Sequence, residues 1–326
     1  MPGLSERVRR LVACPACLND LAFSDVGATC SVCGQTYPKT PEGCDDLRLR
    51  TLKRRTLEFE VGPSANGHHL PRFEPMPANP SAQLDYRSIS IPNHLQRGNR
   101  LSRELLSYFP RSESGGAMLD VGCGGEPFRD ICAHTNLEYV GIDYDRAPTM
   151  LADAHALPFK DDSFELVISF AVLEHIRHPQ VALREIHRVL KPGAPFIGTV
   201  AFLEPFHLDS YFHPTHLGTY SLLSAAGFEV EHLEPNTRWS GLHAQAAMGL
   251  FPHMSWTIAR AMVLPLELMH RLWWKIGRVL QPRPATSEAA RRLVTTAGFR
   301  FVCRKPSSLQ PAIADAAASI SAGAFS

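Results

Sequence analysis

The spacing of hydrophobic and polar residues divides the chain into stretches with different periodicities. Between residues 101 and 236, short apolar runs alternate with segments of helical spacing, as in successive β-α-β units. The runs Ala117–Asp120 and Tyr139–Asp143 have the length and composition of buried parallel strands. This pattern predicts an α/β fold. A last strand-like run, Phe299–Arg304, completes the sheet after an interruption.

The interruption, at about residues 237–298, contains long helical patterns rich in Trp and Met. Apolar residues recur there at three- and four-residue spacing, which predicts an amphipathic helix. Basic residues occupy another face of it, and Trp273 and Trp274 suit a water–lipid boundary. We favour a lid over the active site or a dimer seam, with peripheral membrane contact through residues 254–280 as the alternative. Polar residues and Pro252 interrupt the uncharged run Trp239–Ala259, so we do not interpret it as transmembrane.

The flanking stretches predict the remaining organisation. Residues 47–100 begin with a basic run between Arg48 and Arg55 and continue with six prolines, so we expect a basic and Pro-rich linker. Residues 306–326 are rich in Ala and Ser, and we expect a disordered tail. The predicted units are residues 1–46, the linker 47–100, a main domain 101–305 and the tail.

Charge narrows the functional classes. The 326 residues include 33 basic and 32 acidic side chains, a net charge of +1, which argues against a protein that coats nucleic acid along its whole surface. The N-terminus lacks the apolar run of a secretory signal. We therefore expect a cytoplasmic, reducing compartment, where eight cysteines favour metal binding or free thiols over disulfides.

Four cysteines carry the strongest local signal. Two Cys-x-x-Cys pairs, Cys14 with Cys17 and Cys30 with Cys33, have the spacing of a tetrahedral Zn²⁺ site. The alternatives are two disulfides or a redox pair, and both fit a reducing compartment less well. A closed four-sulfur site is structural, because no coordination position remains open for a substrate. Cys44 lies outside the spacing and is interpreted as a spare thiol.

A glycine-rich turn follows the first strand of the main domain. The strand ends at Asp120, and Gly122, Gly124 and Gly125 follow, so backbone and ligand can approach closely there. About twenty residues later the second strand ends at Asp143, whose carboxylate can accept both hydroxyls of a ribose. Alone, this motif is also compatible with a dinucleotide site.

The segments that follow favour one family. They run from Leu151 to Phe159, through Asp162–His175, to the break at Lys191–Gly193 and the strand Pro195–Phe202. In order and spacing, residues 105–236 with 299–305 resemble class I S-adenosylmethionine-dependent methyltransferases of the type 11 group. The resemblance implies a Rossmann-like seven-stranded sheet, with the helical insertion before the last strand. The N-terminal segment resembles zinc-ribbon modules fused to, or partnered with, some methyltransferases.

The resemblance also implies a cofactor site. It assigns eight residues to S-adenosylmethionine: Asp120, Gly122, Gly124, Asp143, Asp153, Ala154, Ser169 and Phe170. The first three would lie under the methionine part, Asp143 would hold the ribose, and Asp153 with the Ala154 amide would face the adenine. Ser169 and Phe170 would lie beside the sulfonium. One departure is Glu126, which stands where the family often has a third glycine.

Histidines near the expected acceptor side are candidates for a general base. His175 follows the fourth strand, and His207 lies in the loop after the fifth, as do His213 and His216. We choose His175 and His207 as catalytic candidates, although a histidine at position 175 also suits a structural brace. A metal held by His207, His213 and Asp209 fits no familiar ligand spacing.

Three functions remain open at this point. The favoured one is methyl transfer, with oxygen as the expected acceptor atom, on a small-molecule, lipid-linked or saccharide acceptor, because the chain is neutral overall and its insertion is apolar. The second is an RNA methyltransferase that grips phosphates with the ribbon and the Arg48–Arg55 run. The third is a non-catalytic protein that binds the cofactor and uses the ribbon as a scaffold.

Overall fold

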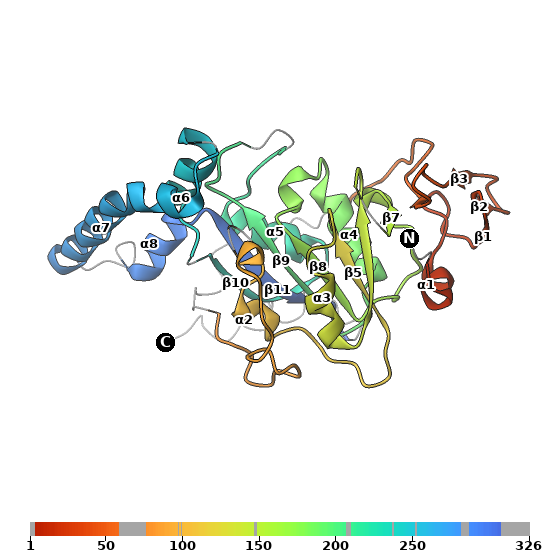
Figure 1. The fold of residues 1–326 in the computed structure, drawn as a ribbon, viewed down its shortest axis with the longest axis horizontal. Coiled ribbons are helices and arrows are strands. Elements are labelled where there is room, and N and C mark those ends of the chain that lie inside the picture. Colours follow the sequence, from red (N-terminus) through yellow and green to blue (C-terminus); the bar gives the residue numbers. More distant parts are fainter. Residues whose placement is uncertain are drawn as a thin grey trace, which may run out of the picture.

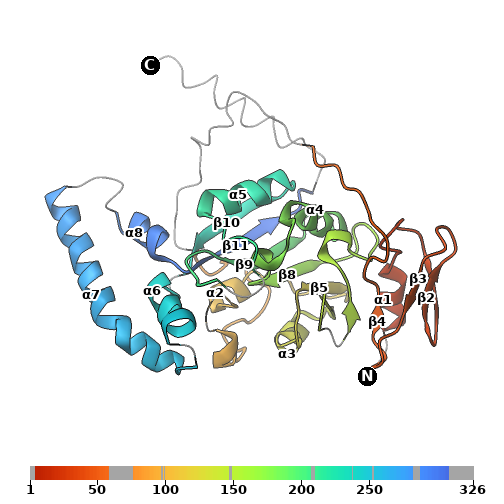
Figure 2. The same ribbon diagram turned by 90° about the horizontal axis from the view of Figure 1, so that it is seen from above.

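The computed structural model covers the whole chain, and a defined set of residues is described. These are residues 4–58, 76–146, 149–206, 210–236, 238–251, 253–281 and 287–307, apart from positions 97 and 99. A zinc-ribbon-like module lies at one end of the molecule, a central sheet in the middle, and a helical arm at the other end (Figures 1 and 2). The predicted tail from 308 onward lies outside the described residues.

The N-terminal module is a short helix followed by a small sheet. Helix α1 (Glu6–Leu11) begins after Ser5, whose side chain accepts a hydrogen bond from the Val8 amide and caps the helix. Strands β1 (Leu21–Ser24), β2 (Gly27–Cys30) and β3 (Thr36–Pro38) pair antiparallel in that order. So small a sheet has little apolar core of its own, and a bound metal would supply the missing stability.

The central sheet has eight strands in the order β10-β11-β9-β8-β5-β6-β7-β4. Strands β8, β5 and β6 run parallel and are buried along nearly their whole length, which explains their continuous apolar runs. The bounds are β5 Ala117–Val121, β6 Glu138–Asp143, β7 Met150–Leu151, β8 Leu166–Phe170, β9 Pro195–Ala201, β10 Glu229–Pro235 and β11 Gly298–Arg304. Strand β11 is antiparallel to both neighbours, β9 and β10. The predicted Rossmann-like sheet is confirmed.

The eighth strand comes from the N-terminal module. Strand β4 (Asp45–Asp46) pairs parallel with β7, so Asp45 lies opposite Met150 and Asp46 opposite Leu151. The chain continues the pairing, because the Leu47 amide donates to the Leu151 carbonyl at 2.8 Å. The ribbon therefore ends in the edge strand of the main sheet and is joined to it directly by backbone hydrogen bonds.

Two apolar cores cover the two faces of the sheet. Alternate residues of β5 separate between them: Leu119 and Val121 belong to one core and Met118 to the other. Helices α4 (Pro179–Val189) and α5 (His216–Ala225) pack into the first core, and α2 (Arg103–Leu106) and α3 (Arg129–Cys132) pack into the second. Figure 1 shows α3 and α4 on opposite sides of β5.

Residues 76–96 pack against the sheet, although the sequence predicts part of a linker there. Apart from the 3₁₀ turn η1 (Asn93–Leu95) they form irregular structure, as the prolines require. Their apolar side chains are nevertheless buried in the second core; these are Met76, Leu84, Ile89, Ile91 and Leu95. Because this packing joins the segment to the domain, the boundary at residue 101 does not separate two bodies. The middle of the predicted linker, residues 59–75, lies outside the described residues.

The insertion before β11 forms the helical arm. It contains α6 (Gly241–Ala244), the π-helical turn η5 (Gln245–Leu250), α7 (Trp256–Leu280) and α8 (Glu288–Thr295). In Figure 2, α7 lies along the outer edge of the molecule, farthest from the ribbon. No helix in the described part of the chain is both long enough and apolar enough to cross a membrane.

Candidate metal centre and cofactor site

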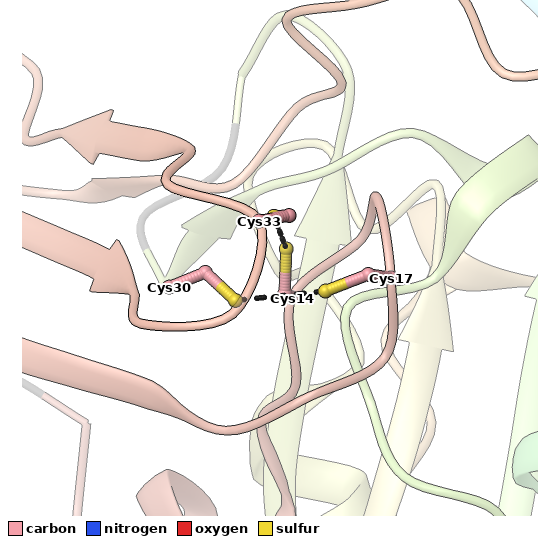
Figure 3. Close-up of side chains that lie close together, drawn as sticks. All are labelled: Cys14, Cys17, Cys30 and Cys33. Atoms are coloured by element: carbon pink, nitrogen blue, oxygen red, sulfur yellow. Dashed lines mark hydrogen bonds between the residues drawn. The ribbon is translucent and has the colours of Figure 1, made fainter.

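The four predicted ligand cysteines converge (Figure 3). Their sulfur atoms all lie within 4.8 Å of one another, with Cys14 Sγ 3.6 Å from Cys33 Sγ and Cys17 Sγ 3.5 Å from Cys30 Sγ. Four sulfurs placed 2.3 Å from a common tetrahedral centre would lie about 3.8 Å apart, so these spacings fit a Zn²⁺ ion. They are far longer than the roughly 2.05 Å of a disulfide bond.

The backbone around both cysteine pairs forms the same turn. The Leu18 amide donates to the Cys14 carbonyl at 2.7 Å, and the Gly34 amide donates to the Cys30 carbonyl at 3.0 Å. Leu18 and Gly34 occupy equivalent positions, and both are left-handed, with φ of 62° and 73°. The sequence marks the second turn through its glycine, whereas the first turn holds a leucine in a conformation that favours glycine.

Hydrogen bonds around Cys17 favour its thiolate form, whereas at Cys33 the Gln35 amide is outweighed by desolvation and the neighbouring thiols, which raise the pKa of Cys33 to about 12. The Asn19 side-chain amide donates to Cys17 Sγ at 3.4 Å and lowers the pKa of Cys17 to about 6. The Tyr37 hydroxyl lies 3.3 Å from Cys14 Sγ, and its ring is buried. Metal ligands of this type bind as thiolates, so the donor set fits Zn²⁺. Cys44 is buried outside the cluster, as the spacing predicts.

The glycine-rich turn is fixed to the end of β6. The amides of Gly122 and Cys123 both donate to the Ile142 carbonyl, at 2.9 and 3.0 Å. A side chain at Gly122 would collide with Val172, 2.5 Å away, and its φ of 77° also requires glycine. At Gly124, by contrast, a Cβ atom would meet nothing within 4 Å. The turn therefore offers open space on its outer side.

Asp143 faces that turn from the end of the neighbouring strand. Its Oδ2 accepts a hydrogen bond from the Gly124 amide at 3.0 Å. Its Oδ1 accepts from the Asp145 and Arg146 amides at 3.1 and 3.3 Å. These bonds orient the carboxylate: both lone pairs of Oδ1 are used, and Oδ2 keeps one lone pair for a further donor. The predicted pair of glycine turn and acidic strand end is brought together.

Asp120 is buried at the end of β5, beneath the turn. Its carboxylate accepts a hydrogen bond from the Tyr139 hydroxyl. Burial raises the pKa of Asp120 to about 7; the Tyr139 bond acts against this, while the charges of Glu126 and Asp143 add to it. Three acidic side chains thus share one edge of the sheet, and a cationic ligand would relieve their repulsion.

Replacing Asp120 should make the ligand-free protein more stable in a pH-dependent way. The native state holds the Asp120 proton up to about pH 7, whereas the unfolded chain releases it near 3.8, so wild type loses stability as pH rises between these values. We expect the advantage of Asp120→Asn to grow by at most about 1.4 kcal/mol per pH unit in that window and to reach roughly 2–4 kcal/mol at pH 8.

Urea unfolding from pH 4 to pH 8 measures this difference. Asp130→Asn, the same change at an exposed site on α3, is the matched control and should follow wild type. A constant difference between Asp120→Asn and wild type across the range would contradict the assignment of a raised pKa.

Glu126 forms a polar network that the sequence did not predict. It adopts φ of 58°, the left-handed conformation that the usual glycine would adopt. Its carboxylate accepts hydrogen bonds from Arg129 Nε at 2.7 Å and from the Thr149 hydroxyl, and Arg129 also donates to Thr149 at 2.9 Å. Arg129 lies over the Tyr139 ring, 4.6 Å from its centroid. A local cation therefore offsets the Glu126 charge. The Glu-x-x-Arg spacing across the turn that precedes α3 was the available signal.

Comparisons with known proteins match this same region. The profile of the family described as "Methyltransferase domain" matches residues 119–198. This range contains the glycine turn, the three acids Asp120, Asp143 and Asp153, and the start of β9. A curated protein of Mycolicibacterium smegmatis, named "Probable S-adenosylmethionine-dependent methyltransferase", is 30% identical over 138 residues, covering 36% of this chain and 54% of that protein.

This chain carries a class I S-adenosylmethionine-dependent methyltransferase domain. The resemblance to this methyltransferase family, inferred from the sequence, is thus confirmed.

Two further proteins are similar to part of this chain. The 24-methylenesterol C-methyltransferase 2 of Oryza sativa is 31% identical over 130 residues, 34% of this chain and 36% of that one. The structure of Haemonchus contortus phosphoethanolamine N-methyltransferase 2 with S-adenosyl-L-methionine is 19% identical, covers 62% of this chain and 51% of that one, and gives a TM-score of 0.38. The chain spans about half, or less, of the length of the curated relatives.

The predicted adenine residues lie one strand farther along the same edge of the methyltransferase domain. Asp153 follows β7 and caps the 3₁₀ turn η3 (Ala154–Ala156), accepting from the His155 amide at 2.9 Å. Its Oδ1 also lies 2.6 Å from His155 Nδ1, and although burial acts in the opposite direction, these bonds lower the pKa of Asp153. The Asp153 carboxylate therefore pairs with His155 and shares no contact with Asp120 or Asp143 in the described part of the chain. Its contact with adenine stays a prediction.

Ser169 and Phe170 end strand β8 of the methyltransferase domain, next to β5. The Ser169 hydroxyl is fully buried and is one of the polar atoms that lack a hydrogen-bond partner within the described part of the chain. Phe170 packs on Phe128, with ring centroids 4.8 Å apart. A buried hydroxyl without a partner at this strand end fits a place for a polar group of the cofactor.

The candidate histidines lie in different surroundings. His175 is half-buried in the 3₁₀ turn η4 (Leu173–His175) directly after β8. His216 is buried at the start of α5, where burial lowers its pKa to about 4. His213 Nδ1 lies 3.1 Å from the Phe202 carbonyl oxygen. His207 and Asp209 lie outside the described residues, so the catalytic prediction for His207 and the metal alternative stay untested.

A cavity of about 700 Å³ adjoins the loop that follows β9. One side is formed by that loop, including Phe202 and His213, and the other by the helical arm, including Glu267 and His270 on α7. Strands β8 and β9 are parallel, with Phe170 opposite Thr199, so Phe202 lies at the same edge of the sheet as the end of β8. The helical insertion thus forms a wall of this cavity, and its role as a lid stays a prediction.

The basic run after the ribbon is largely occupied by internal contacts. Four of its five basic side chains bind other parts of this chain: Arg48 and Arg50 contact Asp46, Lys53 donates to the Pro15 carbonyl, and Arg55 pairs with Glu185. The RNA-methyltransferase alternative needs these side chains to face phosphates. Their internal contacts give that alternative no support.

Proposed function

We propose that the protein transfers the methyl group of S-adenosylmethionine to a small-molecule or lipid-linked acceptor, at oxygen, in the cavity between the β9 loop and the helical arm. The observation that carries the proposal is the position of this cavity, on the edge of the sheet that holds the glycine turn and the acidic strand ends. A sterol methyltransferase among the relatives is consistent with a lipid-like acceptor.

The proposed binding roles follow from the contacts. Asp143, held by the Gly124 amide, accepts a ribose hydroxyl at the remaining lone pair of Oδ2. The open outer side of Gly124 accommodates the methionine part, and buried Asp120 attracts its positive charge. The amide of Ala154 and the side chain of Asp153 lie where the adenine is expected, and Ser169 with Phe170 lies beside the reacting centre. The cofactor supplies an electrophilic methyl group on a sulfonium, ready for in-line attack.

The remaining task of the protein is to orient the acceptor and take up its proton. We assign the proton uptake to His213. A carbonyl oxygen only accepts hydrogen bonds, so His213 Nδ1 carries the proton in the neutral ring and Nε2 is the basic nitrogen. The ring lines the cavity on the acceptor side, and its Nε2 is buried. His175 stays a second candidate, because it follows the strand that ends beside the cofactor.

His213→Gln should reduce turnover about 10²- to 10⁴-fold while leaving cofactor affinity unchanged, since general-base catalysis contributes in that range. Labelled cofactor, incubated with lipid, RNA and small-molecule extracts, identifies the fraction that takes the label. Calorimetry with S-adenosylhomocysteine reports the affinity. His270→Gln, a second histidine of the cavity wall, is the matched control and should keep most of the activity. Labelling of RNA alone, or full activity of His213→Gln, would contradict the proposal.

The zinc site belongs to the same proposal as a structural element. We propose that Cys14, Cys17, Cys30 and Cys33 hold one Zn²⁺ that stabilises the ribbon and, through β4, the edge of the main sheet. With all four positions filled by sulfur, the ion takes no part in the methyl transfer.

A further inference from the structure

Helix α7 presents an apolar surface that the rest of the described chain does not cover. Ala259 is its one buried residue, although the helix has 25 residues. Large apolar side chains on it are between 42% and 80% exposed, and they recur every three or four positions: Ile258, Met262, Leu266, Met269, Leu272, Trp273, Ile276, Val279 and Leu280. At 100° per residue they fill an arc of roughly 140°, which we call the outer face.

The opposite side of α7 is tied to the protein. Trp256 stacks on Trp239 with ring centroids 4.5 Å apart, and its carbonyl lies 3.1 Å from His243 Nε2. Glu267 accepts a hydrogen bond from the Ser240 hydroxyl. These contacts fix the rotation of the helix about its axis, so the outer face is held away from the domain. Figure 2 shows α7 at the outer edge of the molecule.

A strip of positive charge borders the outer face. Arg260, Arg271, Lys275 and Arg278 are exposed and lie at neighbouring angles on the helix, between the outer face and the attached side. The single acid of α7, Glu267, points to the attached side, where it binds Ser240. The surface therefore combines a broad apolar face with a cationic border and no acidic residue on the exposed side.

We infer that α7 lies in the surface of a membrane that contains anionic lipid, with its outer face among the acyl chains and its basic strip at the headgroups. Helices with this division of apolar and basic residues bind bilayer interfaces through burial of the apolar face and through attraction of the basic residues to anionic headgroups. A second copy of the chain fits less well, because its α7 would bring four further cations and no free acid. The inference rests on the outer face and is independent of the reaction proposed above.

The side of α7 opposite the outer face lines the cavity in which we place the acceptor. Glu267, His270 and Arg271 of α7 line the cavity, while the outer face would contact lipid. One helix therefore separates the bilayer surface from the proposed acceptor site. An acceptor with an apolar tail would have a short path from the membrane to the cavity.

Vesicle flotation of the full chain tests the inference. The probes are vesicles of phosphatidylcholine alone and vesicles with about 30 mol % phosphatidylglycerol, at low salt and at about 0.5 M NaCl, where charge attraction is screened. We expect binding to the anionic vesicles that weakens at high salt. Replacing Met269 and Leu272 by Glu should reduce it at least tenfold, and replacing Lys275 and Arg278 by Gln should reduce it by about tenfold on anionic vesicles.

Val26→Glu is the matched control, because Val26 is an exposed apolar residue of the ribbon, at the other end of the molecule. It should bind vesicles like wild type. All replaced positions are exposed, and an unchanged melting temperature shows that each variant folds. Absence of binding to anionic vesicles, or undiminished binding by the Met269 and Leu272 variant, would overturn the inference. A dimer in sedimentation that this variant disperses, with vesicles leaving the wild-type dimer intact, would instead assign the outer face to a second copy.

Discussion

Asp143→Ala should lower the affinity for S-adenosylmethionine about ten- to a hundredfold while leaving the fold intact. The carboxylate would accept a ribose hydroxyl at the remaining lone pair of Oδ2, and a hydrogen bond to a charged group contributes about 1.5–3 kcal/mol. The loss also releases the Gly124 amide, which Asp143 holds at 3.0 Å, so the turn under the methionine part becomes less ordered. Calorimetric titration with the cofactor and with S-adenosylhomocysteine measures the change.

Asp145→Ala is the appropriate control for that experiment. Asp145 lies two residues away and is exposed, so its removal changes the net charge equally without touching the glycine turn. We expect its affinity to stay within about threefold of wild type, because exposed charges interact weakly through solvent. Equal effects of the two replacements would mean that Asp143 acts through general charge alone. No effect of either would remove Asp143 from the cofactor site.

The sequence predicts the strands and the edge at which the site forms, because buried parallel strands require continuous apolar runs. Asp120 and Asp143 end two such runs, and the structure brings them together around the glycine turn. Asp153 was harder to assign, since an acid two residues after a short strand also caps a local turn. The structure shows that cap with His155. Sequence spacing alone does not distinguish these roles.

Other features depend on contacts between distant segments, which a sequence pattern does not contain. Strand β4 consists of two aspartates, a composition that disfavours strands, yet it pairs with β7 across about a hundred residues. The segment 76–100 reads as a linker because of its prolines, and only its buried apolar residues reveal that it belongs to the domain. For α7 the periodicity predicted the amphipathic pattern, but not which face the protein leaves exposed.

Removing the metal should unfold the ribbon and weaken cofactor binding together. Cys30→Ser leaves three thiolates without the ion, and a chelator leaves all four without it. Structural Zn²⁺ sites contribute about 10–16 kcal/mol of apparent binding energy in small domains. The exit from the ribbon contacts the cofactor edge, because Arg48 binds Asp46 and donates to the Tyr144 carbonyl at 3.0 Å, next to Asp143. We therefore expect loss of ribbon structure and an S-adenosylmethionine affinity reduced about three- to tenfold, the size of a modest coupling between sites.

Metal analysis, limited proteolysis and calorimetry separate the parts of this expectation. Wild type purified without chelator should contain one equivalent of zinc, and Cys30→Ser should contain almost none and be cut within the ribbon. Cys44→Ser removes a buried thiol of the same module outside the cluster and should keep both metal and affinity. Less than one equivalent in wild type would refute the zinc site. Full metal loss with unchanged cofactor affinity would contradict the coupling. It would show that the Arg48 contact with the Tyr144 carbonyl persists when the ribbon unfolds, so that β4 and Arg48 connect the two units without transmitting the loss of the metal.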